Sequence, residues 1–250
     1  ATGSLGKDIV TELRRQNVHL RILGRSWDSF KKAGLNDMPN VELIVSDVAK
    51  AELAYNPSWF TDVQCLVCVA RPRFPSTPLE RMAYFALVDN LSRMACEYRV
   101  PRMLLLGMPY LRKGNFPIET KGMNLFKQTE SLARTRATDS TATELTVARI
   151  AQMSEANFLL QAAQQRGIWP CIKGFNPHLR FITSRDFSLA VANYVNTDEA
   201  VPVKHELLVG GPQLVTWREL GGMISDITGK QLTMIDLPLW LLRLVLLLTH

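Results

Sequence analysis

Thr2, Gly3, Ser4, Leu5 and Gly6 form a short glycine turn directly before a stretch with helical spacing. Small residues at such a turn let the backbone approach a ligand closely, and the N–H groups that open a helix attract phosphate. The chemistry that this pattern favours is pyrophosphate binding. Glycine turns before helices are common, so the weight of this one depends on the elements that follow it.

The next predicted strand ends at Gly24, Arg25 and Ser26, about twenty residues after the glycine turn, which is where dinucleotide-binding folds contact the adenosine ribose. An acidic residue there binds the 2′-hydroxyl of NAD, whereas a basic residue suits the 2′-phosphate of NADP. Arg25 therefore favours NADP over NAD. The alternative is that Arg25 is a solvated turn residue.

The elements that would position these residues alternate between strand and helix patterns, which predicts a Rossmann-type α/β fold with a doubly wound parallel sheet. The near-continuous apolar run 63–70 is typical of a parallel strand covered on both faces. Strands are expected at 18–23, 41–45, 63–70, 103–106, 144–149 and 205–209, helices at 7–16, 79–98, 122–136, 158–166, 185–194 and 217–228, and a loop at 167–177.

We expect residues 1–150 to form the nucleotide-binding domain, and residues 151–250 to form a small C-terminal α/β lobe for a substrate or partner. The chain opens inside a strand-to-helix turn, so a first strand, and any targeting segment, is expected before Ala1. The apolar run 237–248 is too short to span a bilayer and is predicted to be either a buried helix or a helix on a membrane surface.

Several segments resemble the atypical short-chain dehydrogenase/reductase family, which includes NmrA-like redox sensors, the nucleotide-binding accessory subunit of respiratory complex I and assembly factors of plastid photosystems. The resemblance covers nearly the whole chain, and the strand-turn-helix segment 209–220 is its most specific part. It rests on residues 1–6, 46–48, 88–90, 99–102, 126–130, 146–149, 185–187, 209–220 and 237–240.

The resemblance implies roles for individual residues around a dinucleotide. Asp47 could also cap a helix, and Lys127 could either contact the nicotinamide ribose or pair with Glu130. The implied positions are Thr2, Gly3, Ser4, Leu5 and Gly6 at the pyrophosphate, Arg25 and Ser26 at the ribose 2′ position, Asp47 and Val48 at the adenine, Ala70 and Arg71 on the nicotinamide-side path, Gly107 and Met108 beneath the ring, and Lys127 in the lysine position of the family's catalytic pair.

The sequence departs from the family where ordinary members carry out catalysis. Such enzymes use a Tyr with a Lys four residues later, so that the phenol can donate a proton while hydride moves. No tyrosine of this chain is followed by Lys at that spacing, and Met123, whose thioether cannot donate a proton, occupies the tyrosine position. The usual Ser at the end of the fifth strand is replaced by Gly107 or Met108. A substitute pair from Tyr110 and Lys113 has the wrong spacing.

Composition narrows the classes of partner. The chain is 47% hydrophobic and 21% charged, as in a globular protein, and its formal net charge of +6 favours anionic partners. The basic residues are scattered, which argues against nucleic-acid binding. Cys65 and Cys68 lie three apart in a predicted strand and point to opposite faces, and the four histidines have no metal-ligand spacing, so no metal site is expected.

Three functions stay open on the sequence alone. The first is a non-catalytic nucleotide-binding accessory or assembly subunit of a membrane-bound respiratory or photosynthetic complex. The second is an NADPH-dependent oxidoreductase or epimerase-like enzyme with a non-standard proton donor, and the third is a scaffold that no longer binds nucleotide. In a eukaryote the first function implies a mitochondrial or plastid protein with peripheral membrane contact, and otherwise a cytoplasmic one.

Overall fold

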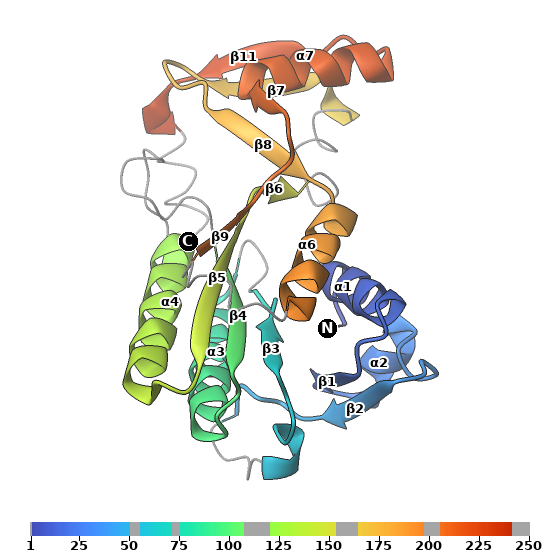
Figure 1. Cartoon of the computed structure of the whole chain (residues 1–250). Coiled ribbons are helices and arrows are strands. Elements are labelled where there is room, and N and C mark those ends of the chain that lie inside the picture. Colours follow the sequence, from blue (N-terminus) through green and yellow to red (C-terminus); the bar gives the residue numbers. More distant parts are fainter. Residues whose placement is uncertain are drawn as a thin grey trace. The chain divides into compact units, whose positions relative to one another are not determined.

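The structure, a computed structural model, describes residues 2–50, 56–71, 76–107, 121–153, 165–197 and 206–241. The chain divides into two compact units, each built from two stretches of sequence. The first unit contains Ala1–Ile150 and Ser184–Val209, and the second contains Ala151–Thr183 and Gly210–His250. Figure 1 labels the elements of both units.

The first unit is built on parallel strands in two sheets. One sheet has the order β1-β2 and the other has the order β3-β4-β5-β9, and every pairing in both is parallel. The strands are β1 (Leu20–Gly24), β2 (Val41–Val45), β3 (Cys65–Cys68), β4 (Arg102–Gly107), β5 (Glu144–Ile150) and β9 (Glu206–Val209).

Helices cover both faces of the larger sheet. Met103 and Leu105 of β4 belong to a core cluster that also contains side chains of α3 and α4. Leu104 of β4 points to the opposite face because side chains alternate along a strand. It is in register with Thr146, whose hydroxyl group is 3.0 Å from the Tyr194 hydroxyl of α6. The doubly wound arrangement is therefore confirmed. The helices of this unit are α1 (Ser4–Arg15), α2 (Trp27–Ala33), α3 (Pro78–Glu97), α4 (Lys121–Ser140) and α6 (Ser184–Asn196), with a 3-10 turn η1 (Pro57–Trp59).

Local sequence explains how α3 begins and how it is held against α4. The Thr77 hydroxyl accepts the N–H of Glu80, and the Glu80 carboxylate accepts the N–H of Thr77, which is a reciprocal capping box. Further along α3, the Asp89 carboxylate accepts a hydrogen bond of 2.9 Å from the guanidinium of Arg136 on α4. The two helices are thus joined by a polar contact as well as by the apolar cluster.

In its described residues, the second unit contains two small sheets and one amphipathic helix. The prediction of a loop over 167–177 was wrong in its first half, because β7 pairs in parallel with β11 and buries Trp169 and Cys171 on one face. The Trp169 ring stacks on Trp217 with 4.5 Å between centroids. The elements are β6 (Gln152–Met153), β7 (Ile168–Ile172), β8 (His178–Ile182), β10 (Leu214–Thr216), α7 (Trp217–Thr228) and β11 (Thr233–Leu237), with sheet orders β10-β8-β6 and β11-β7.

Candidate functional site

Most of the predicted site residues lie at the carboxyl ends of the parallel strands of the first unit. Ligands of open α/β sheets bind beyond the carboxyl ends of the strands, because that edge is formed by connecting loops and helix amino ends. Arg25 follows β1, Asp47 follows β2, Arg71 follows β3, and Gly107 ends β4. Met108, like the alternative pair Tyr110 and Lys113, lies outside the described residues.

The amino end of α1 faces the same edge, since α1 packs on β1 through Val10 and Ile22 and precedes that strand in the chain. Gly3 is the N-cap residue, is extended, and has no side-chain cap. A Cβ atom on Gly3 would meet nothing within 4 Å, so the space in front of this helix end is open.

The first turn of α1 has the properties of an anion site. The N–H groups of Ser4, Leu5 and Gly6 precede the first intrahelical bond, which runs from Lys7 N–H to Gly3 O at 3.0 Å. No acidic residue occupies this turn. The partial positive charge at the helix start is therefore left for a ligand, and a diphosphate fits both the charge and the open space. Thr2 before this turn is half-buried.

Arg25 and Ser26 lie in the turn between β1 and α2, and both are exposed. The Ser26 hydroxyl accepts the N–H of Ser29 at 3.2 Å and so caps α2, a role that the sequence analysis missed. The hydroxyl proton of Ser26 remains available for donation, and the Arg25 side chain extends from the same turn. The pair can therefore meet a phosphate or hydroxyl group at this position.

A buried side chain of α3 forms a hydrogen bond with the loop after β2. The Asn90 amide, 8% exposed, donates to Val48 O at 2.8 Å. Asp47 is half-buried and opens a turn in which Lys50 N–H donates to Asp47 O. The sequence analysis gave Asn90 no role. A single amide inside the apolar stretch of a helix does, however, indicate a side chain that forms a buried hydrogen bond.

Ser46, just before Asp47, is a further polar group that the sequence analysis missed. It is 6% exposed, and its hydroxyl has no hydrogen-bond partner among the described residues. A buried hydroxyl without a partner is uncommon, because desolvating it costs free energy. Its position at the carboxyl end of β2 leaves a donor at the candidate site for a ligand or a water molecule.

The residues expected near a nicotinamide ring differ in exposure. Ala70 and Arg71 are exposed, whereas Gly107 is fully enclosed. A Cβ atom on Gly107 would lie 2.5 Å from Cγ1 of Val147 on β5. A serine could not replace Gly107 without a shift of the Val147 side chain or of the backbone that carries it, which gives a packing reason for its absence at this position.

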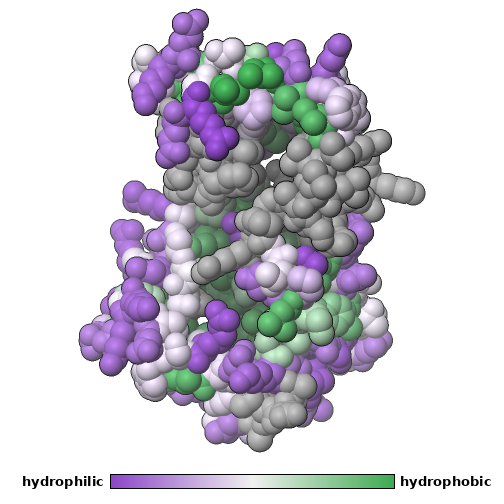
Figure 2. Space-filling view, turned by 180° about the vertical axis from the view of Figure 1, so that it is seen from behind, coloured by the Kyte–Doolittle hydropathy of each residue, from purple (hydrophilic) through white to green (hydrophobic). Residues whose placement is uncertain are grey.

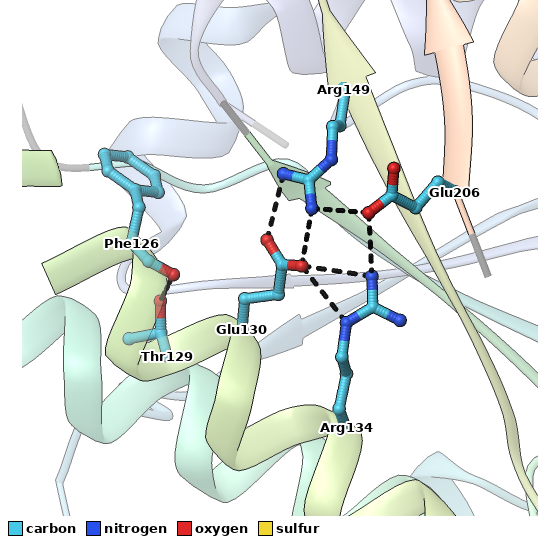
Figure 3. A network of polar contacts seen from close by, with 6 residues as sticks. All are labelled: Phe126, Thr129, Glu130, Arg134, Arg149 and Glu206. Atoms are coloured by element: carbon cyan, nitrogen blue, oxygen red, sulfur yellow. Dashed lines mark hydrogen bonds and ion pairs between the residues drawn. The ribbon is translucent and has the colours of Figure 1, made fainter. Parts of the chain in front are cut away.

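A buried ion network anchors the helix that carries Lys127, as Figure 3 shows. The Arg149 guanidinium on β5 donates to both oxygens of Glu130 on α4, at 3.1 and 2.7 Å, and to Glu206 on β9 at 2.7 Å. Arg134 of α4 donates to Glu130 at 3.0 and 3.1 Å. Lys127, half-buried, lies about one turn before Glu130 on the same helix.

Burial and the two carboxylates act in opposite directions on Arg149. Burial alone would lower the pKa of this guanidinium, but the hydrogen bonds to Glu206 and Glu130 outweigh it, and the pKa is raised above its ordinary value. The Arg149 side chain therefore stays charged, and its role is structural. Nothing in the sequence pattern joins Arg149 to Glu206, since the two lie on different strands.

The described tyrosines do not resemble a catalytic phenol. An active tyrosine of this kind needs a lowered pKa, whereas burial raises the pKa of Tyr84 and of Tyr194. The Tyr98 ring stacks on Phe60 with 5.2 Å between centroids. Tyr55 and Tyr110 lie outside the described residues, and only the backbone of Met123 is described, within α4.

Apolar side chains are also exposed on α3. Leu79 and Met82 are 75% and 70% exposed, and Met82 lines a groove of about 400 Å³ together with Phe85 of α3 and Leu125 of α4. Figure 2, which views the molecule from behind, shows apolar surface next to hydrophilic surface.

Among the described residues, none of the helices combines the length and the apolar character that a membrane span requires. Of the apolar run 237–248, residues 242–248 lie outside the described residues.

No protein-family model matches this sequence, and no curated protein matches it. Solved structures do match over nearly the whole chain. UDP-glucuronic acid 4-epimerase from Bacillus cereus in complex with NAD has a TM-score of 0.71 and 12% identity, over 95% of this chain and 84% of that chain. A short-chain dehydrogenase/reductase superfamily protein from Agrobacterium tumefaciens with bound NAD has a TM-score of 0.69 and 16% identity, over 95% and 84%. Triphenylmethane reductase from Citrobacter sp., complexed with NADP(H), has a TM-score of 0.66 and 16% identity, over 95% and 77%.

At identities this low the likeness establishes the fold and leaves the activity to chemical argument. The parallel sheet, the helices on both of its faces and the glycine turn at the amino end of α1 agree with that likeness. The chain has a Rossmann-type α/β fold like that of these solved structures.

Proposed function

We propose that this protein binds a nicotinamide dinucleotide, NADP(H) in preference to NAD(H), at the carboxyl edge of the parallel sheets. The observation that carries the proposal is the amino end of α1, which has no side-chain cap and no acidic residue in its first turn, and where a Cβ atom on Gly3 would meet nothing within 4 Å. The solved structures with this fold that are named as complexes with NAD or NADP(H) support the same assignment.

The preference for NADP(H) follows from charge at the ribose position. Arg25 and Ser26 are exposed beyond β1, and the described part of this turn has no carboxylate before Asp28. A guanidinium there would bind a 2′-phosphate through charge-assisted hydrogen bonds. The Asp47–Val48 turn, held by Asn90, would contact the adenine.

We further propose that the bound dinucleotide has a structural or sensing role, in an accessory subunit of a larger complex. The missing Tyr-x-x-x-Lys pair and the raised pKa values of Tyr84 and Tyr194 support this assignment. The exposed apolar side chains of α3 and the net charge of +6 are compatible with docking on a partner or an anionic membrane surface.

A second candidate is an NADPH-dependent oxidoreductase or epimerase-like enzyme with a non-standard proton donor. It is supported by Lys127, which lies on α4 three residues before Glu130 and would occupy the position of the family's catalytic lysine. The cofactor would supply the hydride when bound, and Lys127 would orient its ribose. Epimerases and reductases among the structures with this fold support this candidate.

The deciding experiment begins with the purified native protein, which is denatured so that any released nucleotide can be identified by mass spectrometry. Stoichiometric NADP(H) is the expected result. Binding of added NADPH and NADH is then titrated for the native chain, for Arg25→Glu and for the control Lys31→Glu, an exposed charge on α2. Arg25→Glu should weaken NADPH binding roughly tenfold or more, because a hydrogen bond to a charged group contributes about 1.5–3 kcal/mol, and Lys31→Glu should not.

Failure to bind either dinucleotide would overturn the proposal and leave the scaffold function. An equal loss of NADPH affinity in Arg25→Glu and Lys31→Glu would overturn the role of Arg25. Substrate-dependent oxidation of bound NADPH would select the enzyme over the accessory subunit, whereas retention of the nucleotide without turnover would select the accessory subunit.

A further inference from the structure

Trp27, the first residue of α2, has an exposed indole ring beside the turn that carries Arg25 and Ser26. Its exposed fraction is 54%. A tryptophan side chain is largely apolar and is mostly buried in an average folded protein, and aromatic side chains commonly line sites for small ligands. An exposed indole next to a candidate nucleotide site is therefore a candidate contact for the ligand itself.

The Trp27 ring contacts Phe30, three residues later on the same face of α2. The two ring centroids are 5.9 Å apart and the ring planes differ by 72°, which is an edge-to-face contact. Phe30 is fully buried and packs on the last residue of β1, since a Cβ atom on Gly24 would lie 2.5 Å from Cζ of Phe30. An edge-to-face contact covers at most one face of the indole, so the other face is available to a flat ligand.

Helix geometry places the indole at the carboxyl edge of the sheet formed by β1 and β2. α2 follows β1 and begins at that edge, and the Cα–Cβ bonds of a helix tilt toward its amino end, so Trp27 lies over the turn between β1 and α2. Val45, the last residue of β2, is in register with Gly24, points to the same face of the sheet and is 42% exposed. Trp27 and Val45 thus give this edge two exposed apolar side chains.

The adenine base is the part of a dinucleotide that fits these side chains. It is attached to C1′ of the ribose, and C1′ is bonded to C2′, which carries the additional phosphate of NADP. Where Arg25 binds that phosphate, the base leaves the neighbouring ribose carbon and lies within reach of a ring two residues further along the chain. A base has a flat π-face, and stacking on an aromatic side chain is favourable for it.

We propose that Trp27 stacks on the adenine of the bound dinucleotide, with Val45 at the edge of the base. Trp27 is then a binding residue that recognises the base, whereas Arg25 recognises the phosphate. Phe30 and Gly24 are positioning residues, because the close packing of the Phe30 ring on Gly24 fixes the ring against which the indole lies. The inference rests on the proposed function and adds to it a contact that depends on the base.

The test measures the affinity of the native chain, Trp27→Ala and Trp27→Phe for two ligands by calorimetry. The ligands are NADPH and adenosine 2′,5′-bisphosphate, which carries the base but no nicotinamide. Trp240→Ala, which removes another exposed tryptophan, is the matched control. Trp27→Ala should weaken the binding of both ligands at least about fivefold, as expected for the loss of one stacked base, while Trp27→Phe keeps most of the affinity and Trp240→Ala keeps all of it.

Tryptophan fluorescence gives a readout that a merely structural role would not move. Adenosine 2′,5′-bisphosphate should quench part of the emission of the native chain, because the base contacts the indole. This quenching should disappear in Trp27→Phe, which retains an aromatic ring against Phe30, and should persist in Trp240→Phe.

Two results would overturn the inference while the dinucleotide proposal stands. They are unchanged affinity of Trp27→Ala for both ligands, and quenching that persists in Trp27→Phe. A native chain that binds neither NADPH nor adenosine 2′,5′-bisphosphate would overturn the inference and the proposed function together.

Discussion

The substitution Glu130→Gln tests whether the buried ion network holds α4 against the sheet. Arg149 is 7% exposed and donates twice to the Glu130 carboxylate, so the neutral amide leaves a buried guanidinium with one remaining anionic partner, Glu206. Removing one partner of a buried ion pair costs about 3–5 kcal/mol, and because Glu206 remains we expect about 3 kcal/mol.

Arg134→Gln serves as the matched control, because Arg134 contacts the same carboxylate but is 31% exposed. An ion pair of that exposure contributes less than about 1 kcal/mol. Urea unfolding measures the change in the free energy of global unfolding. Native-state hydrogen exchange at Val147 and Ala148, both fully buried in β5, measures the change in the free energy of opening within the first unit.

Equal losses in the two variants, or a loss below about 1 kcal/mol for Glu130→Gln, would refute the reasoning that burial makes the Arg149–Glu130 contact strong. The double variant Glu130→Leu with Arg149→Met removes both charges together. It should recover most of the loss, since an apolar pair of similar volume can replace a buried ion pair.

Three further predictions concern packing, capping and burial. Gly107→Ala should destabilise the protein by about 1–3 kcal/mol in thermal unfolding, because its Cβ would lie 2.5 Å from Cγ1 of Val147, and an unchanged Tm would contradict that packing. Thr77→Ala should cost about 1 kcal/mol by urea unfolding, because the capping box of α3 loses its hydroxyl, while Thr77→Ser should cost little. Burial raises the pKa of the Cys65 and Cys68 thiols from 9.0 to about 11, so peptide mapping should find both unmodified by iodoacetamide at pH 8 in the folded protein and modified in urea. Because the two thiols have higher pKa values in the folded than in the unfolded protein, their contribution to the free energy of unfolding is fully present below pH 9. It should be lost as the pH rises from 9 to 11.

The sequence predicted well those elements whose signals are local. The run at 41–45 is composed of β-branched and apolar residues around one Glu, and β2 has the predicted bounds. α7 also has the predicted bounds, because Thr216 and Glu219 form a capping box that is legible in the sequence. The Rossmann-type fold class followed from the order of these elements and is confirmed.

The missed elements depend on contacts with distant parts of the chain. α2 has only seven residues, and its cap, Ser26, was assigned to a ligand. β7 contains Pro170 and is stabilised by β11, more than sixty residues later, so its local pattern resembled a loop. Long-range pairing of this kind overrides local propensity.

The candidate site likewise contains residues that the sequence could place and contacts that it could not. Residues at strand ends, such as Arg25 and Asp47, could be placed by alternation alone, and their contacts with a dinucleotide stay predictions, as does the functional division of the chain at residue 150. Arg149 could not be connected to Glu130 and Glu206 from the sequence, because that network joins one helix and two strands.

The first unit is built from two separate stretches of sequence, and this affects the order in which its strands can pair during synthesis on the ribosome. Synthesis is sequential and slower than the formation of local structure, so early segments wait for late ones. β5 is complete at Ile150, but its outer neighbour β9 ends only at Val209, after residues 151–183 of the other unit have been made. During that interval the nascent chain presents an open strand edge and an Arg149 without the carboxylate of Glu206. Until β9 has left the exit tunnel, we therefore expect the emerging polypeptide to expose a strand edge that can pair with other chains.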